Sequence, residues 1–70
     1  MRYLAVIEGG VSSFGAYVPD LPGCIAVASS RSEVIERLHD AIELHLEDLK
    51  DQGLEVPMPH SSPELIEVVA

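Results

Sequence analysis

The chain has 70 residues, with 12 carboxylates against four lysine and arginine side chains and a formal net charge of −8. A chain this short forms one domain, and such a domain buries only about 60% of the surface that its unfolded form exposes. The negative charge argues against direct nucleic-acid binding, because that binding depends largely on basic side chains that neutralise phosphates. It favours a basic protein partner instead.

Hydrophobic residues make up 47% of the chain, which excludes a disordered acidic tail and exceeds what one small core needs. We therefore expect a homo-oligomer, either a homodimer or a tetramer. The single cysteine, Cys24, cannot form a disulfide within the chain and suits a reducing compartment. No signal peptide or apolar run of membrane-spanning length is present, so we expect a cytoplasmic protein that does not bind membranes.

Three short strands are predicted in the first half of the chain. Residues 3–7 and 14–18 are rich in β-forming residues and flank a turn of glycine and serine, which indicates an antiparallel hairpin. Residues 19–23 read Pro-Asp-Leu-Pro-Gly, a rigid corner, because proline removes backbone donors and glycine permits a positive φ. Small and β-branched residues at 24–28 predict the third strand.

A long helix is predicted from Ser30 to Gly53. Ser30 and Glu33 form an S-x-x-E capping box, in which each side chain is expected to bind a backbone N–H of the first turn. Gly53 is a typical helix stop. Leu44 falls on the polar side, and His45 lies in the apolar stripe, where we place its ring at the edge of the core. At about 100° per residue, that stripe contains Val34, Ile35, Leu38, Ala41, Ile42, Leu46 and Leu49.

Beyond the helix, the prolines and serines of residues 57–63 predict an extended connector. Residues 65–70 resume an apolar run that we interpret as a fourth strand, added to the chain's own sheet or to that of another subunit. A frayed tail is the alternative. The predicted fold class is α+β in the order β-β-β-α-β, a three- to four-stranded antiparallel sheet with one long helix packed on one face.

The predicted sheet has apolar side chains on both faces, whereas one helix can cover only one of them. We expect another copy of the chain to cover the second face, most simply about a two-fold axis. The residues assigned to this oligomer interface are Leu4, Val6, Tyr17, Ile25 and Val27.

Three arrangements of side chains could support chemistry, and each has a simpler interpretation. His39 and Glu43 have an i,i+4 spacing compatible with a shared metal, with His60 as a third ligand, but exposed flanking side chains explain them as well. Cys24 has no fixed base next to it in the sequence, so we favour a small buried hydrophobe over a nucleophile. A carboxylate cluster could bind Mg²⁺, although its helical members should point away from the sheet: Glu8, Asp20, Glu36 and Asp40. We therefore expect no metal, no cofactor and no catalysis.

The run Ala-Tyr-Val-Pro-Asp-Leu-Pro-Gly-Cys at 16–24, followed by a capped helix with Ala-Ile-Glu-Leu-His-Leu-Glu-Asp-Leu at 41–49, closely resembles the HicB-like antitoxin family. The resemblance covers nearly the whole chain, from the opening strand with Glu8 to the final strand. It implies a partial ribonuclease-H-like fold, which agrees with the predicted order of elements. It also implies one HicB-like domain over residues 1–70, without the C-terminal DNA-binding module that many members carry.

The resemblance implies a non-enzymatic antitoxin that binds a HicA-type toxin, a small basic ribonuclease, and masks its active site. The alternatives are an orphan oligomeric scaffold and a degenerate metal-dependent nuclease. For the Pro-Asp-Leu-Pro-Gly corner, the alternative to a partner-binding role is that it only turns the chain. We place the partner-binding surface at this corner and on the acidic helix face, with Asp20, Leu21, Pro22, Gly23, Glu36, Asp40, Glu43 and Glu47.

Overall fold

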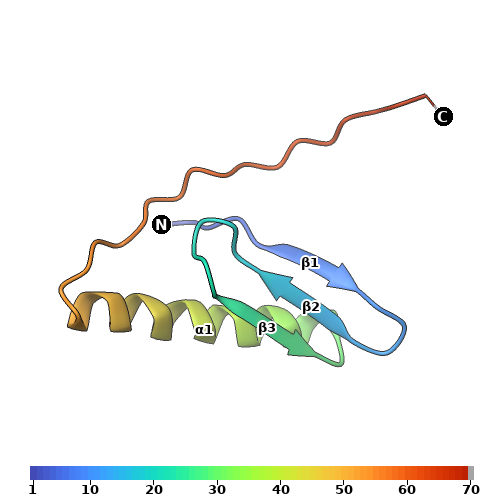
Figure 1. Ribbon diagram of the computed structural model, residues 1–70. Coiled ribbons are helices and arrows are strands. Elements are labelled where there is room, and N and C mark those ends of the chain that lie inside the picture. Colours follow the sequence, from blue (N-terminus) through green and yellow to red (C-terminus); the bar gives the residue numbers. More distant parts are fainter. Residues whose placement is uncertain (70) are drawn as a thin grey trace.

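The computed structural model describes residues 1–69, which form a three-stranded antiparallel sheet and one long helix (Figure 1). The strands are β1 (Val6–Gly9), β2 (Phe14–Tyr17) and β3 (Ile25–Ala28), and the helix is α1 (Arg31–Asp51). The sheet order is β1-β2-β3, so strands that are neighbours in the chain are neighbours in the sheet. The predicted α+β class with a long helix after a short antiparallel sheet is confirmed.

Strand β1 lies further along the chain than the predicted range of 3–7. It pairs with β2 from Val6 opposite Tyr17 to Gly9 opposite Phe14. Strand β2 ends at Tyr17 because Pro19 and the corner follow, and residues 3–5 therefore have no strand beside them. The β-forming composition of residues 3–5 does not decide whether they join the sheet; the length of the partner strand does.

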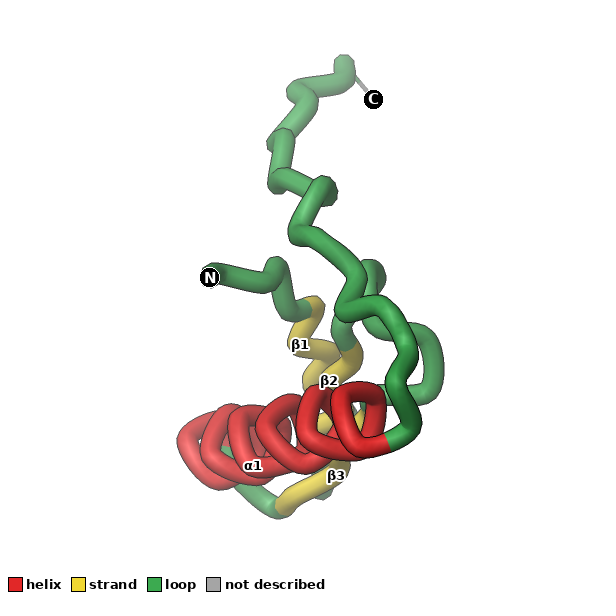
Figure 2. The backbone as a smooth tube through the Cα atoms, turned by 90° about the vertical axis from the view of Figure 1, so that its left-hand side faces the viewer, coloured by secondary structure: helices red, strands yellow, loops and turns green. Residues whose placement is uncertain are grey.

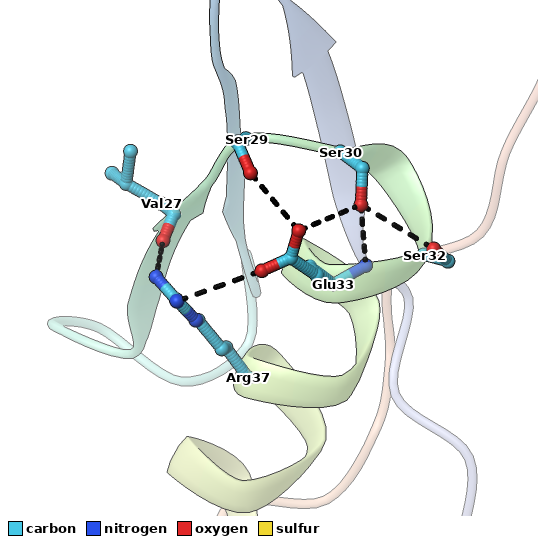
Figure 3. Close-up of polar contacts among 6 residues, drawn as sticks. All are labelled: Val27, Ser29, Ser30, Ser32, Glu33 and Arg37. Carbon is cyan, nitrogen blue, oxygen red and sulfur yellow. Dashed lines mark hydrogen bonds and ion pairs between the residues drawn. The ribbon is translucent and has the colours of Figure 1, made fainter.

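Helix α1 begins where the capping signal predicts. Ser30 is the N-cap, and its hydroxyl accepts a hydrogen bond from the Glu33 backbone N–H at 3.2 Å (Figure 3). The other half of the predicted capping box is not formed, because the Glu33 carboxylate does not bind a backbone N–H. It accepts hydrogen bonds from the hydroxyls of Ser29 at 2.9 Å and Ser30 at 3.2 Å. A second serine beside the N-cap supplies the donor that the backbone was expected to supply.

The helix ends at the predicted glycine. Gln52 is the C-cap, and Gly53 adopts a φ of 70°. The Gly53 N–H donates to the Lys50 carbonyl and the Leu54 N–H donates to the Leu49 carbonyl. This pair of hydrogen bonds defines a Schellman motif, whose left-handed residue favours glycine.

The core lies between α1 and one face of the sheet, and Figure 2 shows the helix lying across that face. Val34 and Leu38 of the helix are 0% and 3% exposed. Ile35 lies on the flank of the predicted stripe and is 42% exposed, while Leu44 is 60% exposed, as its place on the polar side predicts. The buried residues that the sheet and corner contribute are Ala16, Val18, Leu21, Cys24 and Ala28.

The fourth strand expected at residues 65–70 is not formed within the described part of the chain. Residues 54–69 contain no helix or strand, and Ala70 lies outside the described residues. Both views show the chain leaving the sheet after the connector (Figures 1 and 2). An apolar, β-forming run becomes a strand only when a free strand edge lies beside it. The sheet therefore has the lower of the two predicted strand counts. Within residues 1–69, no helix combines the length and apolar composition needed to span a bilayer.

Candidate partner-binding surface

The acidic stripe of α1 consists of Glu36, Asp40, Glu43 and Glu47, all of which are exposed. Helical spacing places these carboxylates within about 60° of one another around the helix axis. The same spacing places them opposite Val34 and Leu38, which are buried against the sheet. The stripe therefore faces away from the core, where a second molecule can reach it.

A histidine lies on the flank of the acidic stripe. The His39 Nδ1 atom lies 3.1 Å from a Glu43 carboxylate oxygen and 3.8 Å from an Asp40 carboxylate oxygen. These three exposed side chains have potential metal-ligating atoms within 4.8 Å of one another. The sequence suggested His60 as the third ligand, but His60 lies against Asp20 instead. Exposed side chains of this kind form ion pairs on many helices, and the cluster alone defines no metal site.

The corner consists of consecutive β-turns that share Leu21. The Leu21 N–H donates to the Val18 carbonyl, and the Cys24 N–H donates to the Leu21 carbonyl, each at 3.1 Å. Pro22 and Gly23 are the central residues of the second turn, and Gly23 has a φ of 84°. Proline followed by a residue with positive φ is the signature of a type II turn.

We expect Gly23→Ala to destabilise the chain by about 1 kcal/mol, because an alanine disfavours the left-handed backbone at this turn. Open space surrounds the added methyl group, so backbone strain is the dominant effect. Gly15→Ala is the matched control, since Gly15 also has open space around it but no positive φ. Urea denaturation measures both variants, and equal unfolding midpoints for the two would contradict the interpretation.

Asp20 holds the C-terminal connector against the corner. Its side chain is 1% exposed. One carboxylate oxygen accepts hydrogen bonds from the backbone N–H groups of His60 at 2.9 Å and Ser61 at 3.0 Å. The other accepts a hydrogen bond from the Ser61 hydroxyl at 2.6 Å and lies 3.1 Å from His60 Nδ1. We call this set of contacts the Asp20 clasp.

The hydrogen bonds from the Ser61 hydroxyl and the Ser61 and His60 backbone lower the pKa of Asp20 from 3.8 to about 2. Donors that bind the ionised carboxylate favour that form, and their effect exceeds the opposing effect of desolvation. Asp20 is therefore charged at neutral pH, with its acceptor positions occupied by its own chain. Its assigned contact with a partner does not follow from the geometry, because the carboxylate is buried and already bound.

The lowered pKa predicts a pH-dependent contribution to stability. Since the folded chain binds the Asp20 proton less tightly than the unfolded chain, the carboxylate stabilises the fold fully above pH 3.8, and this stabilisation is lost as the pH falls toward about 2. Asp20→Asn removes the titration. We expect the difference in free energy of unfolding between wild type and variant to narrow across that window in urea denaturation. A constant difference at every pH would contradict this prediction.

Part of the corner remains available at the surface, next to the helix. Leu21 is fully buried, whereas Pro22 and Gly23 are exposed. A hollow between corner and helix is lined by Gly23, Ile25, Leu44 and Asp48, among others. Ile25 and Leu44 are 67% and 60% exposed. The structure thus brings the exposed half of the corner next to two exposed apolar side chains, in a hollow that Asp48 also lines.

Leu44 and Asp48 were not assigned to the partner surface from the sequence. An exposed leucine on an acidic helix is the only signal that pointed to Leu44, and its proximity to the corner depends on the tertiary fold. Interfaces commonly combine an apolar centre with a polar rim. The hollow and the acidic stripe together match this description.

The carboxylates considered for a nuclease site do not converge. Glu8 is exposed on β1, Asp20 is bound in the clasp, and Glu36 and Asp40 lie on the outer face of the helix. Cys24 is buried, and burial raises the pKa of its thiol. A raised pKa disfavours the thiolate, which is the nucleophilic form.

The sheet face opposite the helix is apolar and open to solvent. Val6, Tyr17 and Ile25 are paired in register across the three strands and therefore project from the same face, and Val27 follows in the same alternation. Tyr17, Ile25 and Val27 are 41%, 67% and 60% exposed. Leu4 and Val6 are half-buried. These are the residues assigned to an oligomer interface, and that assignment stays a prediction.

The fold and its surface describe a small α+β domain with an acidic helix and one uncovered sheet face. The family model described as the HicB_like antitoxin of bacterial toxin-antitoxin system matches residues 3–69. The chain therefore belongs to the HicB-like antitoxin family.

Two proteins are similar to the chain in sequence, and one solved structure is similar to it in fold. The chain is 41% identical over 50 residues to a UPF0150 protein of Helicobacter pylori strain J99, covering 71% of this chain and 69% of that protein. It is 42% identical over 52 residues to a UPF0150 protein of Archaeoglobus fulgidus, covering 73% of this chain and 75% of that protein. A solved structure titled HicA3 and HicB3 toxin-antitoxin complex matches with a TM-score of 0.73 and 28% identity, covering 87% of this chain and 71% of the other.

Proposed function

We propose that this chain is an antitoxin-type binding protein that neutralises a small basic HicA-type ribonuclease toxin by masking its active site. The observation that carries the proposal is the exposed acidic stripe of α1 beside the hollow at the corner, where Ile25 and Leu44 are exposed. Membership of the antitoxin family and the likeness to a chain from a toxin-antitoxin complex support it.

The physical basis is complementarity of charge and shape. A basic ribonuclease carries the positive surface that its RNA substrate requires, and an acidic helix competes for that surface. Opposite potentials raise the rate of association and disfavour wrong partners. The exposed Ile25 and Leu44 side chains in the hollow then supply apolar contact area that excludes water. The chain acts by binding, in the cytoplasm, and requires no metal or cofactor.

Co-expression with any short basic protein encoded beside the gene tests the proposal. A tag on this chain is expected to retain that protein in stoichiometric amount through gel filtration. The variant Leu44→Asp, which leaves both the buried core and the sheet face intact, is expected to lose it. Equal retention by both chains would exclude the hollow from the contact. Absence of any complex with the wild-type chain would favour the orphan scaffold.

We also propose that the uncovered sheet face binds a second copy of the chain. The contact would bury Tyr17, Ile25 and Val27, which are exposed in one copy, about a two-fold axis. Burial of such apolar area is the usual way for a small domain to gain stability. We expect a dimer at micromolar concentration in analytical ultracentrifugation, and a monomer at that concentration would contradict the proposal.

A further inference from the structure

The last described residues of the chain have the composition of a strand but no strand beside them. Leu65, Ile66, Val68 and Val69 are between 77% and 104% exposed. Alternation in an extended chain places Leu65 and Val69 on one side and Ile66 and Val68 on the other. A strand at the rim of a one-sided sheet would have one polar side. Each side of this segment carries two apolar side chains and one glutamate, so both sides have apolar area that requires cover.

The sheet has two edges, and one of them is blocked. At the outer edge of β3, the Arg37 guanidinium donates a hydrogen bond to the Val27 carbonyl at 2.8 Å, and Glu33 holds that guanidinium at 3.7 Å (Figure 3). Within residues 1–69, no hydrogen bond joins the segment 64–69 to β1. The edge of β1 is therefore the one that can accept another strand.

The chain's own segment does not meet that edge. The Tyr3 hydroxyl donates to the Pro57 carbonyl, and the Asp20 clasp holds His60 and Ser61. These contacts fix the connector at the corner end of the sheet. From there both views show the segment projecting away from sheet and helix (Figures 1 and 2).

The geometry points to strand exchange between two copies: residues 64–69 of one chain add to the free β1 edge of a second copy, and the second copy returns its own segment. At about 3.3 Å per residue, six residues match a short strand such as β1 with the extended residues before it. Charge agrees, because one of the two glutamates, Glu64 or Glu67, would share a face with Arg2, the basic residue that precedes β1. The exchange builds on the copy-to-copy contact proposed above and adds an edge to it.

Sedimentation of a matched pair of chains tests the exchange. In the variant, residues 63–70 are replaced by a glycine-serine segment of equal length, which leaves the Asp20 clasp and the core unchanged. We expect its dimer dissociation constant to be at least about tenfold weaker than that of the full chain, because it loses the apolar side chains and the β-forming backbone. Equal dissociation constants would overturn the proposal.

Hydrogen exchange separates the possible arrangements of the segment. In strand exchange, the backbone amides of Ile66 and Val68 or of their neighbours become protected only as the protein concentration rises through the dimer dissociation constant. Protection that is independent of concentration would mean pairing with the chain's own sheet and would overturn the proposal, as would no protection in the dimer. Ile25→Asp tests the sheet face separately. If Ile25→Asp abolishes the dimer and the segment variant keeps it, the face contact stands and the strand exchange is rejected.

Discussion

Leu21→Ala is expected to destabilise the chain by about 2–5 kcal/mol, the usual range for removing a buried leucine side chain. Leu21 is 0% exposed and lies in the core with Val34. It also joins the two turns of the corner, so the cavity would form where the corner is held against the helix. Domains are stable by only about 5–15 kcal/mol, and a 70-residue chain has a small core. A large fraction of the variant should therefore be unfolded in moderate urea.

Leu54→Ala is the control for this prediction, because it makes the same chemical change at a side chain that is 54% exposed. Urea denaturation at one fixed protein concentration compares the two variants with the wild type. We expect a large shift of the midpoint for Leu21→Ala and a small one for Leu54→Ala. Similar midpoints would mean that Leu21 does not anchor the corner.

Reversal of Glu36 and Asp40 to lysine is expected to slow association with the proposed basic toxin by about tenfold or more at low salt. Both carboxylates are exposed on the acidic stripe, where they would steer a positively charged surface. The effect should shrink at high salt, because the Debye length falls to about 3 Å at 1 M. Stopped-flow or surface-based kinetics at two ionic strengths measure this rate.

The control variant has the same change in net charge, but its two substitutions lie outside the acidic stripe. Glu8→Lys with Glu55→Lys alters exposed residues on β1 and beyond the end of α1, away from the acidic stripe. We expect this variant to associate faster than the stripe variant. If both variants slow association equally, only the net charge matters, and the stripe is not the partner surface.

The helix could be predicted closely from the sequence because its signals are local. Ser30 and Gly53 lie at its two ends, and their roles depend on hydrogen bonds to residues three to five positions away in the chain. The strand β1 was misplaced because its ends depend on where β2 stops, which a run of β-forming residues does not reveal. The fourth strand was expected from composition alone, but no edge lies beside it in a single chain.

The candidate site shows the same division between local and distant contacts. The acidic stripe follows from helical spacing, so its residues could be named in advance. The role of Asp20 could not, because its partners His60 and Ser61 are 40 and 41 residues away. Similarly, the hollow joins Gly23 and Ile25 to Leu44 and Asp48 only after the corner folds onto the helix.

The most direct test of toxin neutralisation is a ribonuclease assay with the purified basic partner, titrated with this chain. We predict that RNA cleavage falls in proportion to added chain and stops near a one-to-one ratio of toxin to antitoxin domain, and that the Glu36→Lys, Asp40→Lys variant requires more protein at low salt. Undiminished cleavage in the presence of excess folded chain would contradict the account.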